Sequence, residues 1–116
     1  MAELVALLSK GEGTWAQVAG IIKQGEWENI ILIGNDFAKN FQIDKPFTFI
    51  EIKGQRLVEL KEEIEEKLRG KIKGTEVALS IASGDGKEHM ALISALLAQP
   101  VGVRFTALTK EGIVTL

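Results

Sequence analysis

Residues 76–99 read EVALSIASGDGKEHMALISALLAQ, and this stretch decides the fold. Its first part, Glu76–Ala82, is aliphatic at several consecutive positions, which is typical of a strand that is covered on both faces. The glycine-rich loop Ser83–Lys87 follows, and the apolar spacing then predicts a helix over Lys87–Gln99, which Pro100 ends. The side chains that we expect to face inward from this helix are Met90, Ile93, Leu96 and Leu97. Strand, loop and helix together form the repeating unit of a parallel sheet.

The same unit recurs toward the N-terminus. Further strands are predicted at Glu3–Leu8, Asn29–Gly34 and Phe47–Ile52. One helix is predicted from Thr14, a suitable N-cap, to Gln24, with Trp15, Val18, Ala19 and Ile22 on its inner stripe. A second is predicted over Gln55–Lys73, with an inner stripe of Leu57, Leu60, Ile64, Leu68 and Ile72. The segment Asp36–Lys45 fits either a short helix or a loop, and Pro46 marks its end.

The C-terminal part has a different pattern. Val101–Leu108 and Ile113–Leu116 are predicted strands, and Gly112 in the intervening turn can adopt positive φ, so we expect an antiparallel hairpin. The sequence therefore predicts a single α/β domain over residues 1–116. We expect a three-layer, Rossmann-like arrangement around a mainly parallel sheet of about six strands that ends in this hairpin.

Composition narrows the possible chemistry. The chain has 116 residues, a formal net charge of −2, no cysteine and one histidine, His89. A disulfide framework, a thiolate zinc site and a histidine-cluster metal site are therefore excluded, and we expect neither a metal nor a cofactor. The apolar runs are too short to span a bilayer, which predicts a soluble, cytoplasmic protein without a membrane partner. The slightly acidic balance argues against binding to long nucleic acids.

Two small loops are candidates for ligand binding. If the sheet winds in opposite directions from strand one, strand four lies beside strand one, and the loops that follow these strands flank a crevice. The first loop is Ser9–Thr14 and the second is Ser83–Lys87; each contains glycine and lysine and leads into a helix N-terminus. Backbone N–H groups and partial positive charge at such termini favour phosphate.

Other ligands also fit parts of the pattern. Gly11, Gly13 and Ala16 match a loose dinucleotide-binding motif, with Asp36 about twenty residues further as a ribose acceptor after Asn35. A P-loop is excluded because Glu88 stands where it requires Ser or Thr. His89 has the chemistry of a proton-transfer group, although a packing role is the simpler interpretation, as it is for Trp15.

The order of elements, the loop Ser83–Lys87 before an alanine- and leucine-rich helix, and the closing hairpin resemble the CRISPR-associated Rossmann fold (CARF) domain over nearly the whole chain. The resemblance implies a homodimer that binds cyclic oligoadenylate with the loops after strands one and four, in antiviral defence. It also implies a separate effector protein as a partner. Asp85 departs from the family's loop, because a carboxylate repels phosphate unless it turns away or accepts a ribose hydroxyl.

The leading hypothesis is thus a domain that binds a nucleotide-type second messenger. The candidate ligand-binding residues are Ser9, Lys10, Gly11, Gly13, Thr14, Asn35, Asp36, Ser83, Gly84, Gly86 and Lys87. One alternative is a metal-independent ring nuclease, in which the ribose 2′-hydroxyl attacks the adjacent phosphate while Lys10 or Lys87 stabilises charge. Others are a generic dinucleotide or small-molecule module and an assembly subunit with a vestigial pocket. The sequence does not identify catalytic residues.

Overall fold

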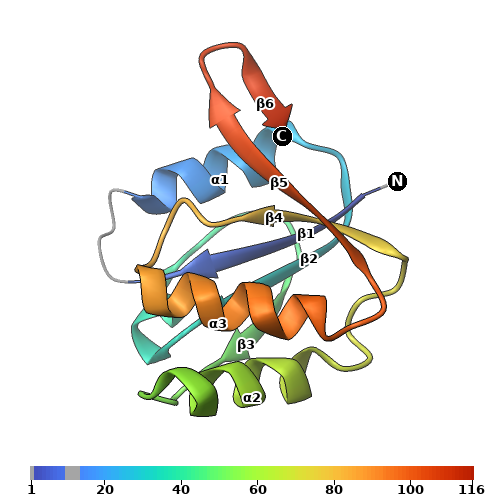
Figure 1. Ribbon diagram of the computed structural model, residues 1–116. Coiled ribbons are helices and arrows are strands. Elements are labelled where there is room, and N and C mark those ends of the chain that lie inside the picture. Colours follow the sequence, from blue (N-terminus) through green and yellow to red (C-terminus); the bar gives the residue numbers. More distant parts are fainter. Residues whose placement is uncertain (1, 10–13) are drawn as a thin grey trace.

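The alternation of strands and helices produces one six-stranded sheet with the order β3-β2-β1-β4-β5-β6 (Figure 1). The computed structural model describes residues 2–9 and 14–116. All neighbouring strands are parallel except β5 and β6, and β4 lies beside β1 as predicted. The strands are β1 (Ala2–Leu8), β2 (Trp27–Gly34), β3 (Thr48–Glu51), β4 (Glu76–Ser80), β5 (Gly102–Thr109) and β6 (Gly112–Thr115). The prediction of a Rossmann-like α/β fold is confirmed.

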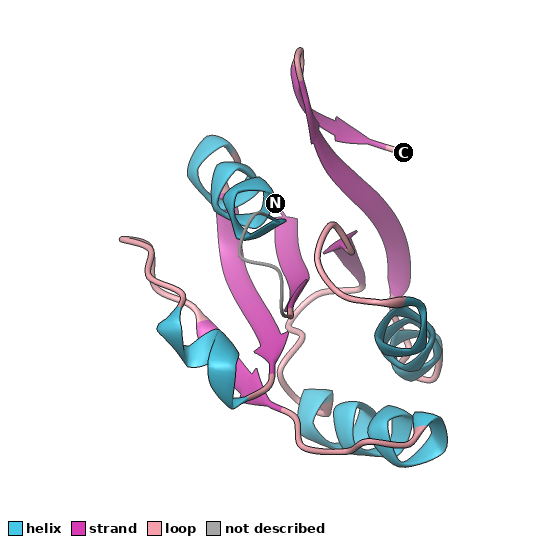
Figure 2. Ribbon diagram, turned by 90° about the vertical axis from the view of Figure 1, so that its left-hand side faces the viewer, coloured by secondary structure: helices cyan, strands magenta, loops and turns pink. Residues whose placement is uncertain are grey.

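Helices cover both faces of the sheet (Figure 2). Helix α1 (Trp15–Gln24) packs on one face, and α2 (Leu57–Leu68) and α3 (Gly86–Leu97) pack on the other. The two-sided burial of β1 explains why its residues are apolar at consecutive positions. Val5 and Leu7 enter the core beneath α2 and α3, while Leu4 enters the core beneath α1. All three side chains are fully buried. A central parallel strand therefore needs apolar residues on both faces.

The inner stripe of α3 differs from the prediction. Met90 and Leu97 are 58% and 69% exposed, so their predicted inward orientation is wrong, whereas Leu96 is buried as expected. The residues that α3 buries are Ala91, Leu92, Ala95 and Leu96. The small alanines Ala91 and Ala95 lie on the buried face, in the core that α3 shares with α2 and the sheet.

Helix α2 is shorter than predicted. It ends at Leu68 rather than Lys73, and Gly70 follows with a φ of 81°, a left-handed conformation that stops the helix. Leu60, Ile64 and Leu68 face the core as expected, whereas Leu57 is 37% exposed at the first turn. Strand β4 likewise ends at Ser80, two residues before the predicted end.

The segment after β2 forms a short 3-10 helix, η2 (Asp36–Asn40), followed by an irregular stretch up to β3. Asn35 caps η2, since its side chain accepts a hydrogen bond from the Phe37 N–H at 3.0 Å. Trp15 of α1 packs against Phe37 and Phe41, with ring centroids 5.5 and 5.9 Å away. The aromatic contacts attach this segment to α1, and the predicted core role of Trp15 is confirmed.

Side chains from later in the sequence cap the C-terminal end of α1. The Lys45 ammonium donates hydrogen bonds to the carbonyl oxygens of Ile22 at 2.7 Å and Gly25 at 3.0 Å, and the Trp27 indole N–H donates to Ile21 O at 2.8 Å. Ile21 O also accepts from the Gly25 N–H, whereas the Ile22 carbonyl has no further helical turn to accept from, and a cation there also opposes the negative end of the helix dipole.

The predicted antiparallel hairpin is confirmed. Gly112 adopts a φ of 102° in its turn, and Ala107 pairs with Val114 across it. Among the helices of the described residues, none is long and apolar enough to cross a membrane.

Candidate functional site

Ser9, directly after β1, and Ser83, after β4, meet at the carboxyl edge of the sheet, which faces the viewer in Figure 2. The Ser9 N–H donates a hydrogen bond of 2.9 Å to Ser83 Oγ, and both residues are buried. Gly84 follows with a φ of 106°, and a Cβ atom at this position would lie 2.4 Å from Leu7 Cδ2. The loop after β4 therefore needs glycine to turn tightly over the end of β1.

Asp85 turns toward the helix that it precedes. Asp85 Oδ1 accepts a hydrogen bond of 2.8 Å from the Glu88 N–H, and Glu88 Oε1 accepts one of 2.9 Å from the Asp85 N–H. This reciprocal arrangement is a capping box for α3. Asp85, the residue that departs from the loop pattern of CARF domains, thus has a structural role, because its carboxylate satisfies a backbone donor of the helix.

Glu88 also joins the two loops. Ser9 Oγ lies 2.9 and 3.0 Å from the two carboxylate oxygens of Glu88, 79 positions away in sequence. Glu88 was not among the candidate residues, although the Asp85-x-x-Glu88 spacing is itself a capping-box signal. The carboxylate therefore ties the end of β1 to the start of α3.

A cleft of about 400 Å³ opens beside these loops. One wall comes from Asn35 and Asp36 after β2, another from residues 51–55 after β3, and a third from the first turn of α3 with Lys87. Three candidate residues therefore line it, namely Asn35, Asp36 and Lys87. Ser9, Ser83 and Gly84 belong to the adjoining loops, Gly86 is the first residue of α3, and Thr14 precedes α1. Lys10, Gly11 and Gly13 lie outside the described residues.

The cleft has mixed charge. Its lining includes the carboxylates of Asp36, Glu51, Asp85 and Glu88 and the ammonium groups of Lys53 and Lys87. At the rim, Lys39 Nζ lies 2.9 Å from Glu51 and 3.2 Å from Asp36, and hydrogen bonds to these carboxylates raise the pKa of Lys39. The arrangement offers acceptors for hydroxyl or amino groups on one side and cationic donors for a single anionic group on the other.

Glu63 of α2 fixes the wall formed by residues 51–55. Glu63 Oε1 accepts hydrogen bonds from the N–H groups of Lys53 at 3.0 Å and Gly54 at 2.8 Å, and Lys67 Nζ lies 2.9 Å from Oε2. Burial raises the pKa of the Glu63 carboxyl, but the hydrogen bonds from Lys67, Gly54 and Lys53 outweigh it, so the pKa lies below its ordinary value. Lys87 Nζ holds the same wall from the opposite side, donating to Gln55 O at 2.7 Å.

Replacing Glu63 with alanine is expected to loosen this wall. The change leaves two backbone N–H groups without their acceptor, and we expect a loss of about 1–2 kcal/mol in the free energy of unfolding, measured by urea denaturation. The exposed Glu62 on the same helix is the matched control, and Glu62→Ala should cost less than about 0.5 kcal/mol. Equal losses in the two variants would contradict the positioning role of Glu63.

The remaining candidates have structural partners. His89 Nε2 lies 2.9 Å from Ser83 O, and since a carbonyl only accepts, this nitrogen carries the proton in that contact. Trp15 is 9% exposed and its indole N–H donates to Ser9 O at 2.7 Å. Elsewhere on the surface, Arg104, near the start of β5, pairs with Glu76 at 3.4 Å.

The described residues thus form a Rossmann-like α/β domain with a polar cleft at the carboxyl edge of its sheet. No family model matches the chain, and comparisons with curated proteins and with solved structures find no match.

Proposed function

We propose that this chain binds a nucleotide-type ligand in the cleft at the carboxyl edge of the sheet. The observation that carries the proposal is the hydrogen bond from the Ser9 N–H to Ser83 Oγ, which brings the ends of β1 and β4 together at the edge where the cleft lies. The sheet extends in opposite directions from these two strands. Open α/β sheets bind ligands in the crevice outside the carboxyl ends of the strands at such a switch point.

The lining of the cleft supports a ligand with both sugar and phosphate. Its volume of about 400 Å³ falls in the range of small-molecule sites. The Lys87 ammonium suits a phosphate oxygen, whereas Asn35 and Asp36 suit ribose hydroxyls. A nucleotide presents both kinds of group within one molecule.

The charge balance favours a phosphodiester over a polyphosphate. Four carboxylates and two ammonium groups line the cleft, so a triphosphate would meet net repulsion. A cyclic oligoadenylate also carries one negative charge at each phosphate, but its sugars separate these charges, so the cleft has to accommodate only one phosphate at a time. This preference agrees with the resemblance to CARF domains, and we propose a cyclic oligoadenylate-like second messenger as the ligand. A role in CRISPR-type antiviral defence, reported to a separate effector protein, rests on that resemblance.

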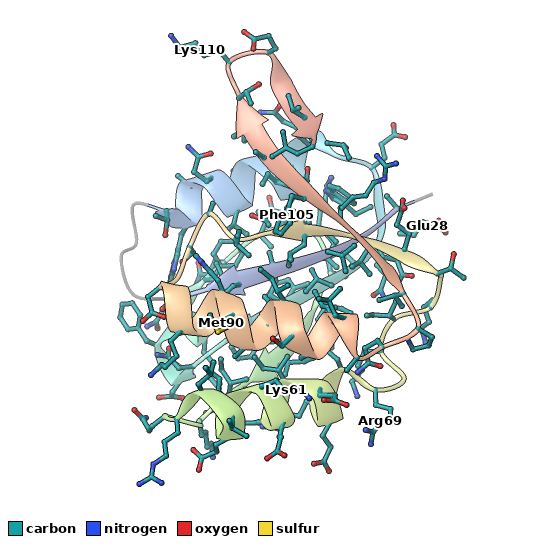
Figure 3. All side chains as sticks on the ribbon, viewed as in Figure 1. Glu28, Lys61, Arg69, Met90, Phe105 and Lys110 are labelled. Carbon is teal, nitrogen blue, oxygen red and sulfur yellow. The ribbon has the colours of Figure 1, made fainter. Side chains whose placement is uncertain are left out.

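A binding experiment with variants tests the proposal. Titration calorimetry with cyclic tetra-adenylate is expected to detect binding by the wild-type chain and weaker or no binding of ATP. Lys87→Ala should weaken the binding at least about tenfold, because a charged hydrogen-bond donor is lost, while the fold loses less than about 1 kcal/mol. Lys110→Ala, at the tip of the hairpin in Figure 3, should leave affinity unchanged.

Several outcomes would count against the proposal. Absence of binding by any cyclic or linear adenylate would reject the nucleotide ligand, and equal affinity in Lys87→Ala and the wild type would reject this cleft. Binding followed by the appearance of linear adenylates would replace a pure sensor with a ring nuclease at the same site.

A further inference from the structure

A second cleft opens at the amino edge of the sheet, opposite the edge that carries the proposed ligand cleft. Its volume is about 620 Å³, within the range of small-molecule sites. The starts of β1, β2 and β4 line it, together with the turn before β4, Arg104 of β5 and Thr115 of β6. Segments from most of the sheet therefore contribute side chains to one cavity.

The lining of this cleft has charges of both signs. Its carboxylates are Glu3, Glu28 and Glu76, and its cations are Lys73 and Arg104. A ligand with only positive charge would meet the two cations, and a ligand with only negative charge would meet the three carboxylates. A ligand with one charge of each sign avoids both kinds of repulsion.

Glu3 is the buried charge of the cleft, with 6% of its surface exposed. Its carboxylate accepts hydrogen bonds from Asn29 Nδ2 and from the N–H groups of Lys73 and Gly74. Burial raises the pKa of Glu3, but these hydrogen bonds lower it below its ordinary value, so the group is ionised at neutral pH. None of the ion pairs that the described residues form includes Glu3. A carboxylate has about four acceptor positions, so one remains for an ammonium group, which would also neutralise the buried charge.

Glu28 adds a second carboxylate on the same side of the cleft. It lies near the start of β2, which pairs with the start of β1, and Figure 3 labels it at this end of the sheet. The Glu28 side chain is exposed and takes part in none of the ion pairs of the described residues. The β1–β2 side therefore offers two carboxylates to a cationic group.

Arg104 provides the partner for an anionic group. Its Nε lies 3.4 Å from Glu76 Oε2, and this contact leaves the two terminal nitrogens of the guanidinium group for an incoming carboxylate. Arg104 pairs with Ala78 of β4, and Ala78 pairs with Leu4, the residue after Glu3. Two strand spacings of about 4.8 Å thus separate the backbone of Arg104 from that of β1. The acidic and the basic partners stand on either side of β4.

The cleft also has apolar surfaces. Ala78 is half-buried on β4, between the two charged sides. Trp27 lines the cleft at the start of β2, and the hydrogen bond from its indole N–H to Ile21 O, 2.8 Å long, fixes its ring. Apolar side chains of a ligand therefore have surfaces to contact.

We infer that the amino-edge cleft binds a small zwitterion of the dipeptide class, with its ammonium group at Glu3 and Glu28 and its carboxylate at Arg104. Two residues span up to about 7 Å, so a dipeptide holds its terminal charges further apart than a single amino acid does. This separation suits partners on either side of β4. The inference is independent of the proposed function, because the two clefts share no lining residue.

Titration calorimetry with leucyl-leucine tests the inference. The wild type is expected to bind this dipeptide. Leucyl-leucinamide lacks the carboxylate and N-acetyl-leucyl-leucine lacks the ammonium group, so each should bind at least about tenfold more weakly. Leucine should also bind more weakly, because it does not reach both sides of the cleft. Tryptophan fluorescence should change on binding, since Trp27 lines the cleft.

Variants of exposed residues test the orientation of the ligand. Arg104→Gln should weaken leucyl-leucine about tenfold and leave the affinity for leucyl-leucinamide unchanged, because the amide has no carboxylate to lose a partner. Glu28→Gln should weaken leucyl-leucine about threefold, the effect of an exposed ion pair, and leave N-acetyl-leucyl-leucine unchanged. Arg69→Gln and Glu62→Gln replace exposed residues outside the cleft and are the matched controls. Circular dichroism should show native helix content in all four variants.

Several results would overturn the inference. These are no binding of leucyl-leucine by the wild type, equal affinity for the dipeptide and its two blocked derivatives, or an equal loss in the control variants. Wild-type affinity in Arg104→Gln would overturn the placement of the carboxylate, and equal affinity for leucine would overturn the dipeptide class.

Discussion

Replacing Gly34 with valine is expected to lower the free energy of unfolding by about 3 kcal/mol or more. Gly34 ends β2 where β1, β2 and η2 converge, just before the candidate cleft. A Cβ atom there would lie 2.5 Å from Ala38 Cβ and 2.6 Å from Leu8 O. The second contact is with the backbone of β1, so relief requires the strand or η2 to move, and a close-packed interior resists such movement. Urea denaturation followed by circular dichroism measures the loss.

Gly86→Ala is the matched control for this prediction. Gly86 has no atom within 4 Å of an added Cβ, and it stands at the first position of α3. Alanine is favoured over glycine in a helix, so we expect no loss and a gain of up to about 1 kcal/mol. If both variants are as stable as the wild type, the close approach of β1, β2 and η2 at Gly34 is wrong.

Glu3→Gln is expected to cost about 2 kcal/mol at pH 7. The buried Glu3 carboxylate accepts hydrogen bonds from Asn29 Nδ2 at 2.7 Å, from the Lys73 N–H at 2.9 Å and from the Gly74 N–H. A carboxamide has one acceptor oxygen, so the substitution sets an NH₂ group against backbone donors. The carboxylate links β1, β2 and the turn that leads into β4, so the loss should affect cooperative unfolding of the whole sheet.

The loss of stability caused by Glu3→Gln should disappear in acid. Burial raises the pKa of Glu3, but the hydrogen bonds from Lys73, Asn29 and Gly74 together lower it below the ordinary 4.5. A group with a depressed pKa in the folded state stabilises the fold above its unfolded pKa, and this contribution is lost as the pH falls through the folded value. The difference in the free energy of unfolding between wild type and Glu3→Gln should therefore shrink as the pH falls below 4.5 and vanish once the pH lies below the lower folded-state pKa. The exposed Glu28, replaced by glutamine, serves as control, and a pH-independent gap between wild type and Glu3→Gln would refute the ionic role.

The sheet could be predicted from the sequence because its central strands have runs of consecutive apolar residues. In β1, five consecutive apolar residues, Leu4–Leu8, all enter one core or the other, so no alternative placement satisfies them. The sequence alone does not show in the same way which face of α3 is buried. Its sequence has two apolar stripes, and only the folded arrangement, in which Ala91, Leu92, Ala95 and Leu96 are buried, shows which stripe faces the core.

The candidate site was predicted less completely. Loop positions followed from strand order, so Ser9 and Ser83 were expected at one edge and do meet there. The roles of Glu63 and Glu88 depend on contacts with backbone and side-chain groups of other segments, and Ser9 and Glu88 are separated by 79 positions. Charge and helical spacing give Glu63 the same signal as any solvated glutamate, and the capping-box spacing of Glu88 does not reveal its contact with Ser9, so the fold must be known before these contacts can be identified.

The cap that Lys45 provides for α1 affects how this part of the domain unfolds locally. Lys45 belongs to the irregular stretch before β3, yet its ammonium group holds the last carbonyls of a helix some 20 residues earlier. If that stretch detaches, α1 loses the cation at its terminus and its final turn frays. The two segments therefore form one cooperative unit of local unfolding, although no strand pairing connects them directly.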